Sequence, residues 1–201
     1  MAIASRSCVE HDQGTSASMD AYFVIIDSHW MASRLPRSLA MLQNATSSYP
    51  GIIEVQVVAI SENTYLSSLS RRYGARFSTI ALPSIGARSN EIARRSRGRH
   101  LVFATPRARL SNDWIIKADQ WLSKTSWDAV ILRPKRKIAT QGLTRGLRRL
   151  WPMPPRPGVL CVAYEWFERI GGFDPALDDT AHQDLVTRLR ACQARVLELE
   201  L

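Results

Sequence analysis

Arginine and lysine side chains are concentrated in two segments, and this pattern has the most direct chemical consequence. No carboxylate occurs from Ala129 to Tyr164, and a second group of arginines precedes an apolar run near residue 100. Clustered cations favour phosphate, which nucleotides, nucleic acids and anionic membranes carry. A solvated basic face without a ligand is the alternative. The cations are Arg133, Lys135, Arg136, Lys137, Arg145, Arg148, Arg149 and Arg156, and then Arg94, Arg95, Arg97 and Arg99.

A histidine and a tryptophan stand directly after the first apolar run. His29 and Trp30 lie where a nucleobase could stack, because ligands of parallel sheets bind beyond the carboxyl ends of the strands. A tryptophan of the core is the alternative for Trp30. The histidines lack metal-ligand spacing, and His100, which opens an apolar run, is expected to be structural. The signatures G-x-G-x-x-G, H-E-x-x-H, G-x-S-x-G and the Walker A motif are absent.

Composition favours one globular domain. The chain has 201 residues, of which 45% are hydrophobic and 22% charged, and its formal net charge is +9. These values exclude wholesale disorder. No apolar run reaches the roughly 18 residues of a spanning helix, and residues 1–19 are expected to form a flexible tail rather than a signal peptide. Cys161 and Cys192 are expected to be small core residues.

Apolar runs and helical periodicities alternate along the chain after residue 20. The helical patterns lie at 35–42, 66–73, 114–122 and 185–192. Such alternation predicts an α/β fold in which helices cover both faces of a mostly parallel sheet. The predicted strands are Ala21–Ile26, Ile53–Ile60, Arg76–Ile80, His100–Ala104, Asp128–Leu132 and Arg195–Leu199.

Prolines interrupt this pattern. Four of them lie within Trp151–Pro157, where they forbid a helix and favour extended backbone. Together with the preceding cations they predict a basic, Pro-rich insertion at about 133–157 inside a domain of residues 20–201. Each cation contributes about 1 kcal/mol near an anionic membrane, so the segment 133–149 is a candidate for peripheral membrane contact.

The segment from Val159 to Leu189 contains the most specific motifs. A strand is followed by Phe-Glu-Arg-Ile-Gly-Gly-Phe-Asp and then by Asp184-Leu185 with Arg188-Leu189. This order resembles the second half of family-2 glycosyltransferases, whose single-domain GT-A fold is Rossmann-like. Gly171 and Gly172 are expected to form a tight turn with positive φ, and Phe173 to pack beneath it.

The first half of the chain supports the same resemblance. Gly86-Ala-Arg-Ser-Asn90 and the following His100–Ala104 are similar to a stretch of that family, in which an Arg and an Asn lie near the nucleotide. The resemblance implies nucleotide-sugar binding by Arg88 and Asn90. The motifs keep their order from about residue 21 to 199.

Three acidic positions of the family carry other residues here. Glu62 is a displaced substitute for the Asp that holds the nucleobase, and His29 and Glu62 complete the predicted donor site. Arg107 stands where the family has a carboxylate for Mn²⁺ or Mg²⁺, and a guanidinium cannot bind a metal. No metal site is therefore predicted. The catalytic acid is replaced by Ala181 and His182, so that of the acidic cluster Asp184 remains.

Two hypotheses explain these departures. In the first, the chain is a metal-independent transferase, in which Arg88, Arg107 or Arg109 neutralises the leaving diphosphate. His182 would be the general base, with Asp184 beside it. In the second, the chain is a catalytically inactive GT-A-like binding or scaffold protein. His182 is then a surface residue of a helix start, and Asp184 a first-turn carboxylate favoured by the helix dipole.

The resemblance also implies the partners. A transferase of this family uses a nucleotide-sugar donor and a saccharide or lipid acceptor, and we expect it in the cytoplasm or at the inner face of the membrane. Nucleic-acid binding rests on charge alone and has no motif to support it.

Overall fold

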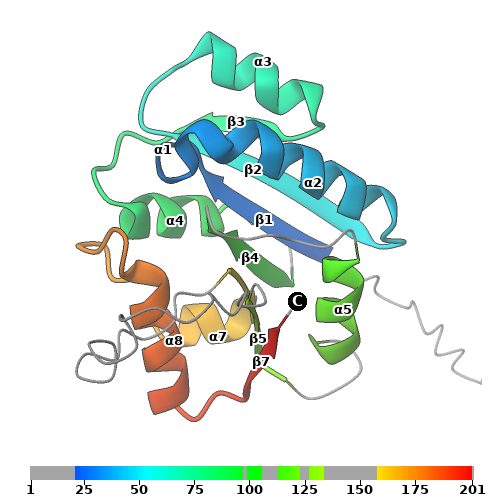
Figure 1. The fold of residues 1–201 in the computed structure, drawn as a ribbon. Coiled ribbons are helices and arrows are strands. Elements are labelled where there is room, and N and C mark those ends of the chain that lie inside the picture. Colours follow the sequence, from blue (N-terminus) through cyan, green and yellow to red (C-terminus); the bar gives the residue numbers. More distant parts are fainter. Residues whose placement is uncertain (1–20, 97–98, 106–112, 123–126, 134–157, 201) are drawn as a thin grey trace, which may run out of the picture.

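Apolar runs of the chain form a seven-stranded sheet (Figure 1). The structure is a computed structural model that describes residues 21–96, 99–105, 113–122, 127–133 and 158–200. In the described residues the strand order is β3-β2-β1-β4-β6-β5-β7. The strands are β1 (Ala21–Asp27), β2 (Ile52–Ala59), β3 (Arg76–Thr79), β4 (His100–Ala104), β5 (Ala129–Arg133), β6 (Val159–Ala163) and β7 (Val196–Glu200).

The sheet is mostly parallel, as predicted. β3, β2, β1 and β4 run parallel, β5 and β7 do so as well, and β6 lies antiparallel between β4 and β5. The chain proceeds outward from β1 to β3 on one side and then returns to β4 on the other side of β1. This reversal places a topological switch point at the carboxyl ends of β1 and β4, which is where ligands of open α/β sheets bind.

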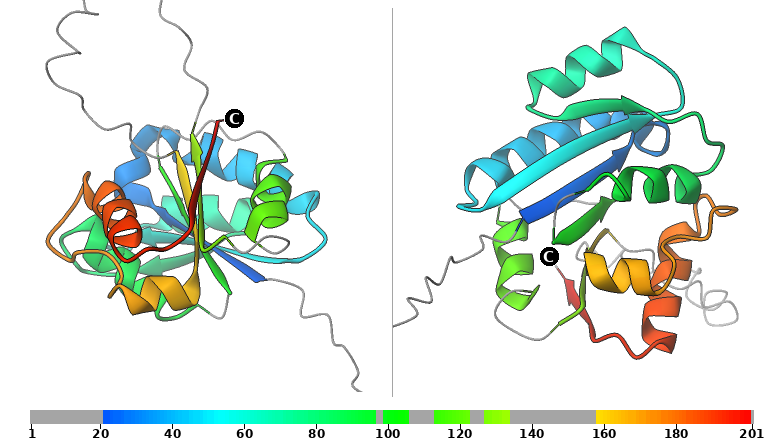
Figure 2. Two further views of the ribbon diagram at one scale, coloured as in Figure 1. Left: turned by 90° about the horizontal axis from the view of Figure 1, so that it is seen from below. Right: turned by 180° about the vertical axis from the view of Figure 1, so that it is seen from behind.

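Helices cover both faces of the sheet (Figure 2). Alternate residues of β1 enter two cores, with Val24 and Ile26 in one and Phe23 and Ile25 in the other. The first core is covered by α1 (Ser28–Met31), α2 (Leu35–Ser47), α3 (Thr64–Arg72) and α5 (Trp114–Leu122), with a 3₁₀ turn at Ala32–Arg34. The second is covered by α4 (Ile85–Ala93), α7 (Tyr164–Arg169) and α8 (Ala181–Ala191).

The predicted strands agree with the observed ones to within one residue at each end. Periodicity did not predict β6, although it is a buried apolar run like β4 and β5. It also did not predict α4, whose buried positions include Arg88 and Ser89. Cys161 is buried as expected, whereas Cys192 is exposed at the end of α8, so that prediction was wrong.

Several predictions fall outside the described residues. These are the tail at 1–19, Arg107 and the insertion after Arg133. Within the described ranges, no helix combines the length and the apolarity that a membrane crossing requires.

The loop between α7 and α8 is joined to α4 by reciprocal hydrogen bonds. Gly171 and Gly172 have positive φ values of 78° and 71°, as predicted, and Phe173 is buried beneath them. The amide of Asn90 donates to the carbonyl of Phe173 and accepts from its N–H, both at 2.8 Å. Gly86 donates its N–H to the carbonyl of Leu177 at 3.1 Å. α4 therefore fixes the loop that leads into α8.

Gly86→Ala tests this joint. Alanine normally stabilises a helix interior relative to glycine by about 1 kcal/mol, but a Cβ here would lie 2.2 Å from the carbonyl oxygen of Asp174. We expect urea denaturation to show a loss of about 1–3 kcal/mol in the free energy of unfolding. Asn44→Ala, on the exposed side of α2, is the control and should be neutral or stabilising. A stabilised Gly86→Ala variant would contradict the close approach.

Candidate active site at the carboxyl ends of β1 and β4

The carboxylate of Asp27 lies at the end of β1 and is 5% exposed. One oxygen, Oδ1, accepts a hydrogen bond from the backbone N–H of Trp30 at 3.0 Å and caps α1. The other, Oδ2, accepts from Nε of Arg88 at 2.6 Å. The side chain of Asp27 therefore fixes the start of α1 after β1 and also the position of the Arg88 guanidinium.

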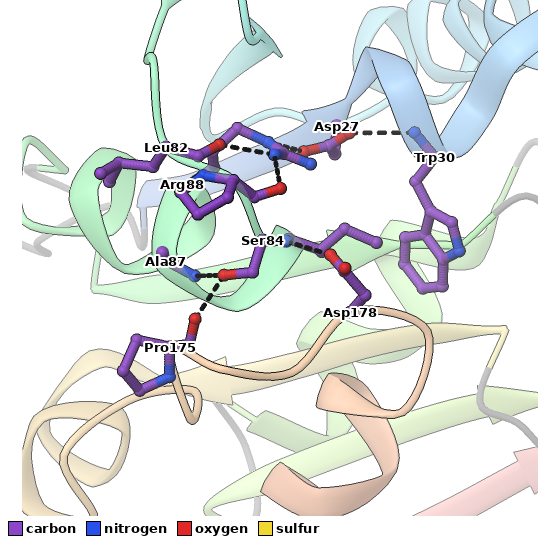
Figure 3. Close-up of polar contacts among 10 residues, drawn as sticks. Asp27, Trp30, Leu82, Ser84, Ala87, Arg88, Pro175 and Asp178 are labelled. Carbon is purple, nitrogen blue, oxygen red and sulfur yellow. Dashed lines mark hydrogen bonds and ion pairs between the residues drawn. The ribbon is translucent and has the colours of Figure 1, made fainter.

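Arg88 extends from α4 into the same position and is 1% exposed (Figure 3). Its Nη1 donates to the carbonyls of Leu82 and Pro83 at 2.7 and 2.8 Å. Its Nη2 has no hydrogen-bond partner among the described residues. The guanidinium thus ties the loop between β3 and α4 to the end of β1. A buried charge requires this kind of pairing, because desolvation of an unpaired ion is costly.

The loop after Phe173 contributes to the same joint. Ser84 caps α4, since its Oγ accepts from the N–H of Ala87 at 3.0 Å, and this hydroxyl donates to the carbonyl of Pro175. The N–H of Ile85 donates to Oδ1 of Asp178 at 2.7 Å. The first N–H groups of α4 are therefore satisfied from within the protein.

His182 lies at the start of α8 inside an aromatic cluster. Its ring centroid is 4.6 Å from that of Trp30, 5.0 Å from Phe173 and 5.9 Å from Phe103. The side chain is 3% exposed, and neither ring nitrogen has a hydrogen-bond partner in the described part of the chain. Burial lowers the pKa of His182 from 6.5 to about 3. The imidazole is therefore neutral near pH 7, and it is buried rather than exposed at the helix start.

Asp184 has a different environment, although it is two residues from His182. Its Oδ2 accepts from Nε of Arg188 at 2.8 Å, and Nη1 of Arg188 donates to the carbonyl of Ile170 at 2.9 Å. His182 is buried against the sheet, whereas Asp184 is half-buried in this ion pair. The two predicted catalytic side chains are therefore not brought together.

The predicted donor-site residues are also distributed over several places. His29 is exposed on α1, directly beyond β1, beside the half-buried Trp30. Arg88 pairs with Asp27, and the amide of Asn90 is bonded to the backbone of Phe173. Glu62 is exposed and lines a pocket between α3 and β3. Of the predicted set, His29, Arg88 and His182 belong to segments that meet around Asp27 and Trp30.

The described residues do not fit a divalent metal ion. β4 ends at Ala104, and Thr105 follows with its N–H donating to the carbonyl of Gly158. The carboxylate of Asp27 is committed to Arg88 and to the cap of α1. Over the ranges that the structure describes, no group of three or more His, Cys, Asp or Glu side chains could hold a metal.

Sequence reasoning missed Asp27, Ser84 and Asp178, which organise this region. A signal existed for the first two. Asp27 follows a strand and precedes a helix, and Ser84 stands before Ile85, which are cap positions. No local signal pointed to Asp178, because it serves a helix that is distant in the sequence.

His182→Phe tests the burial of the neutral imidazole. The unfolded chain binds a proton near pH 6.5 and the folded chain only near pH 3. The contribution of His182 to stability is therefore complete above pH 6.5 and is lost as the pH falls, by about 1.4 kcal/mol per pH unit. Urea denaturation between pH 7 and pH 4 should show that the free energy of unfolding falls more steeply with decreasing pH for the natural protein than for His182→Phe. His29→Phe, at an exposed position, should keep the steep slope. Parallel slopes for the natural protein and His182→Phe would contradict the burial.

Comparison with known proteins gives similarity in structure and none in sequence. No protein-family model matches the chain, and no curated protein matches it. Glucosyl-3-phosphoglycerate synthase from Mycobacterium tuberculosis, solved with Mn²⁺, UDP and glucosyl-3-phosphoglycerate, matches with TM-score 0.67 and 12% identity over 92% of this chain and 71% of that one.

Two further solved structures are similar. The mannosyltransferase PcManGT from Pyrobaculum calidifontis, in complex with GDP-Man and Mn²⁺, has TM-score 0.65 and 18% identity over 90% of this chain and 55% of that one. Mannosyl-3-phosphoglycerate synthase from Rubrobacter xylanophilus has TM-score 0.64 and 12% identity over 92% and 66%. These likenesses, together with the sheet order and the helices on both faces, show that the chain has a GT-A-like fold.

Proposed function

We propose that this chain is a glycosyltransferase that moves a sugar from a nucleotide-sugar donor to a saccharide or lipid acceptor. The GT-A fold supports the proposal, because the similar structures include a complex with UDP and a complex with GDP-Man. Fold alone does not fix function, so the proposal must rest on the site.

The arrangement at the carboxyl end of β1 carries the proposal. The exposed imidazole of His29 and the half-buried indole of Trp30 stand side by side in the chain beyond the strand. Nearby, the buried Nη2 of Arg88 has no hydrogen-bond partner among the described residues. Aromatic rings stack on nucleobases, and a buried N–H group gains most from an acceptor such as a base carbonyl. We place the nucleoside here.

Neutralisation of the diphosphate is proposed to use cations rather than a metal. Arg88 cannot supply a free charge, since Asp27 already neutralises it. We therefore assign to Arg88 the positioning of the loop at Leu82 and Pro83. Arg107 is the sequence-based candidate for the diphosphate, and it lies outside the described residues.

The acceptor is proposed to approach from the side of α8. His182 and Asp184 remain the predicted catalytic residues. Their positions in the structure determine what must happen before either can act as a base. A general base must come within hydrogen-bonding reach of the hydroxyl from which it takes the proton. The imidazole of His182 is packed against Trp30. Trp30 therefore has to move before the imidazole can reach the acceptor hydroxyl.

Calorimetric titration with UDP, GDP and CDP tests the proposal, each with Mn²⁺ and with a chelator. We expect saturable binding of one nucleotide that Mn²⁺ does not strengthen. His29→Ala should weaken it about tenfold, because base stacking contributes about 1–3 kcal/mol, and Asn44→Ala on α2 should leave it unchanged.

The outcomes separate the hypotheses. Absence of binding to all three nucleotides would overturn the proposal. Tighter binding with Mn²⁺ would contradict the metal-independent form. Nucleotide binding with no hydrolysis or transfer of the matching nucleotide sugars would favour an inactive binding protein instead.

A further inference from the structure

A hollow lies at the edge of the sheet, away from Asp27 and Arg88. It has a volume of about 580 Å³ and lies between α3 and the edge strand β3. Figure 1 shows α3 beside β3 at this edge of the sheet, farther out than β1 and β4. We call this hollow the α3–β3 groove. Its lining consists of Glu62, Asn63, Thr64, Ser67, Ser68, Arg71, Phe77 and Thr79.

Most polar side chains of the α3–β3 groove are not bonded to other described residues, although Oδ1 of Asn63 accepts a hydrogen bond from the N–H of Leu66 at 3.0 Å. Thr64, Ser67, Ser68 and Arg71 follow one another at helical spacing on one side of α3. The structure shows no hydrogen bond or ion pair from these side chains, or from Glu62, to any other described residue. Ser70 on the same helix behaves differently, since its hydroxyl donates to the carbonyl of Leu66 at 2.7 Å.

Several charged residues elsewhere on the surface are paired with one another. Arg76 pairs with Glu54, and Arg94 and Arg95 both pair with Glu91. In the groove, a carboxylate and a guanidinium line the same hollow and are not paired. They therefore offer an acceptor and several donors to a ligand, and their charges cancel.

Phe77 adds an apolar surface to this polar lining. Its ring is half-buried, because it also packs against the core beneath α2 and α3. An aromatic ring beside hydroxyl, carboxylate and guanidinium groups matches a pyranose, which has an apolar C–H face and a rim of hydroxyls that both donate and accept. The zero net charge disfavours phosphate. The volume lies within the range of about 300–1,000 Å³ that small-ligand sites have.

We infer that the α3–β3 groove binds a neutral saccharide at a site separate from the carboxyl ends of β1 and β4. Glu62 and Arg71 form hydrogen bonds with hydroxyl groups of the saccharide, and Phe77 packs against the sugar ring. The inference does not depend on the proposed transfer reaction. If the chain is a transferase, the groove holds a saccharide chain beside the site of transfer.

Amide NMR of the ¹⁵N-labelled full chain tests the inference. The probes are maltose, cellobiose, α-1,2-mannobiose and trehalose, each titrated to high millimolar concentration, and uridine as the comparison. We expect at least one disaccharide to cause saturable shifts confined to residues 62–79, and uridine to cause none there. No saturable shift from any of these sugars, or shifts at the ends of β1 and β4 instead, would overturn the inference.

Two arginine variants on α3 supply the matched comparison. Arg71→Ala should weaken the saccharide binding about tenfold, because hydrogen bonds from charged groups are the strong ones. Arg72→Ala removes the neighbouring charge, which does not line the groove, and should leave binding unchanged. Both positions are exposed, so neither change threatens the fold. Equal weakening by the two variants would mean that Arg71 makes no specific contact with the saccharide and would also overturn the inference.

Discussion

The ion pair between Asp27 and Arg88 is the constraint on which the arrangement of the carboxyl-end region depends. Both side chains are almost completely buried, and Nε and Oδ2 are 2.6 Å apart. The pair joins β1 to α4, and through Leu82 and Pro83 it fixes the loop before α4. From α4 the connection continues through Asn90 and Gly86 to the loop at 171–178 and so to the start of α8. Two buried charges therefore hold β1, α4 and the start of α8 in their relative positions.

The aromatic cluster around His182 packs between β1, α4 and the loop at 171–178. Trp30 follows the helix cap formed by Asp27, and Phe173 follows the turn of Gly171 and Gly172. Both rings contact the imidazole of His182, so its position depends on the same elements. Its low pKa is the electrostatic consequence of this burial. A residue that the sequence places at a catalytic position thus also contributes to packing.

The sequence predicted most of the fold because the strands are short apolar runs, each bounded by polar or turn residues. β1, β4 and the tight turn at Gly171 and Gly172 are local patterns of this kind. The site was less predictable, because its contacts join distant residues. Asp27 and Arg88 are 61 positions apart, and Asn90 and Phe173 are 83 apart. The motif that contains Arg88 and Asn90 therefore pointed to ligand binding. In the structure, Arg88 pairs with the carboxylate of Asp27, and Asn90 bonds to the backbone of Phe173.

A double-mutant cycle on the buried pair tests the account most directly, with urea denaturation and nucleotide titration as readouts. Asp27→Asn keeps an oxygen for the cap of α1, and Arg88→Met keeps the length of the side chain. Each single change should cost about 3–5 kcal/mol, because it leaves one charge buried and unpaired. The double change should cost clearly less than their sum. Both single variants should also lose nucleotide binding.

The surface pair of Arg94 and Glu91 is the control, and Arg94→Met should cost no more than about 0.5 kcal/mol. Costs below about 1 kcal/mol for Asp27→Asn and Arg88→Met, adding without coupling and leaving nucleotide binding intact, would contradict the claim that this ion pair organises the site.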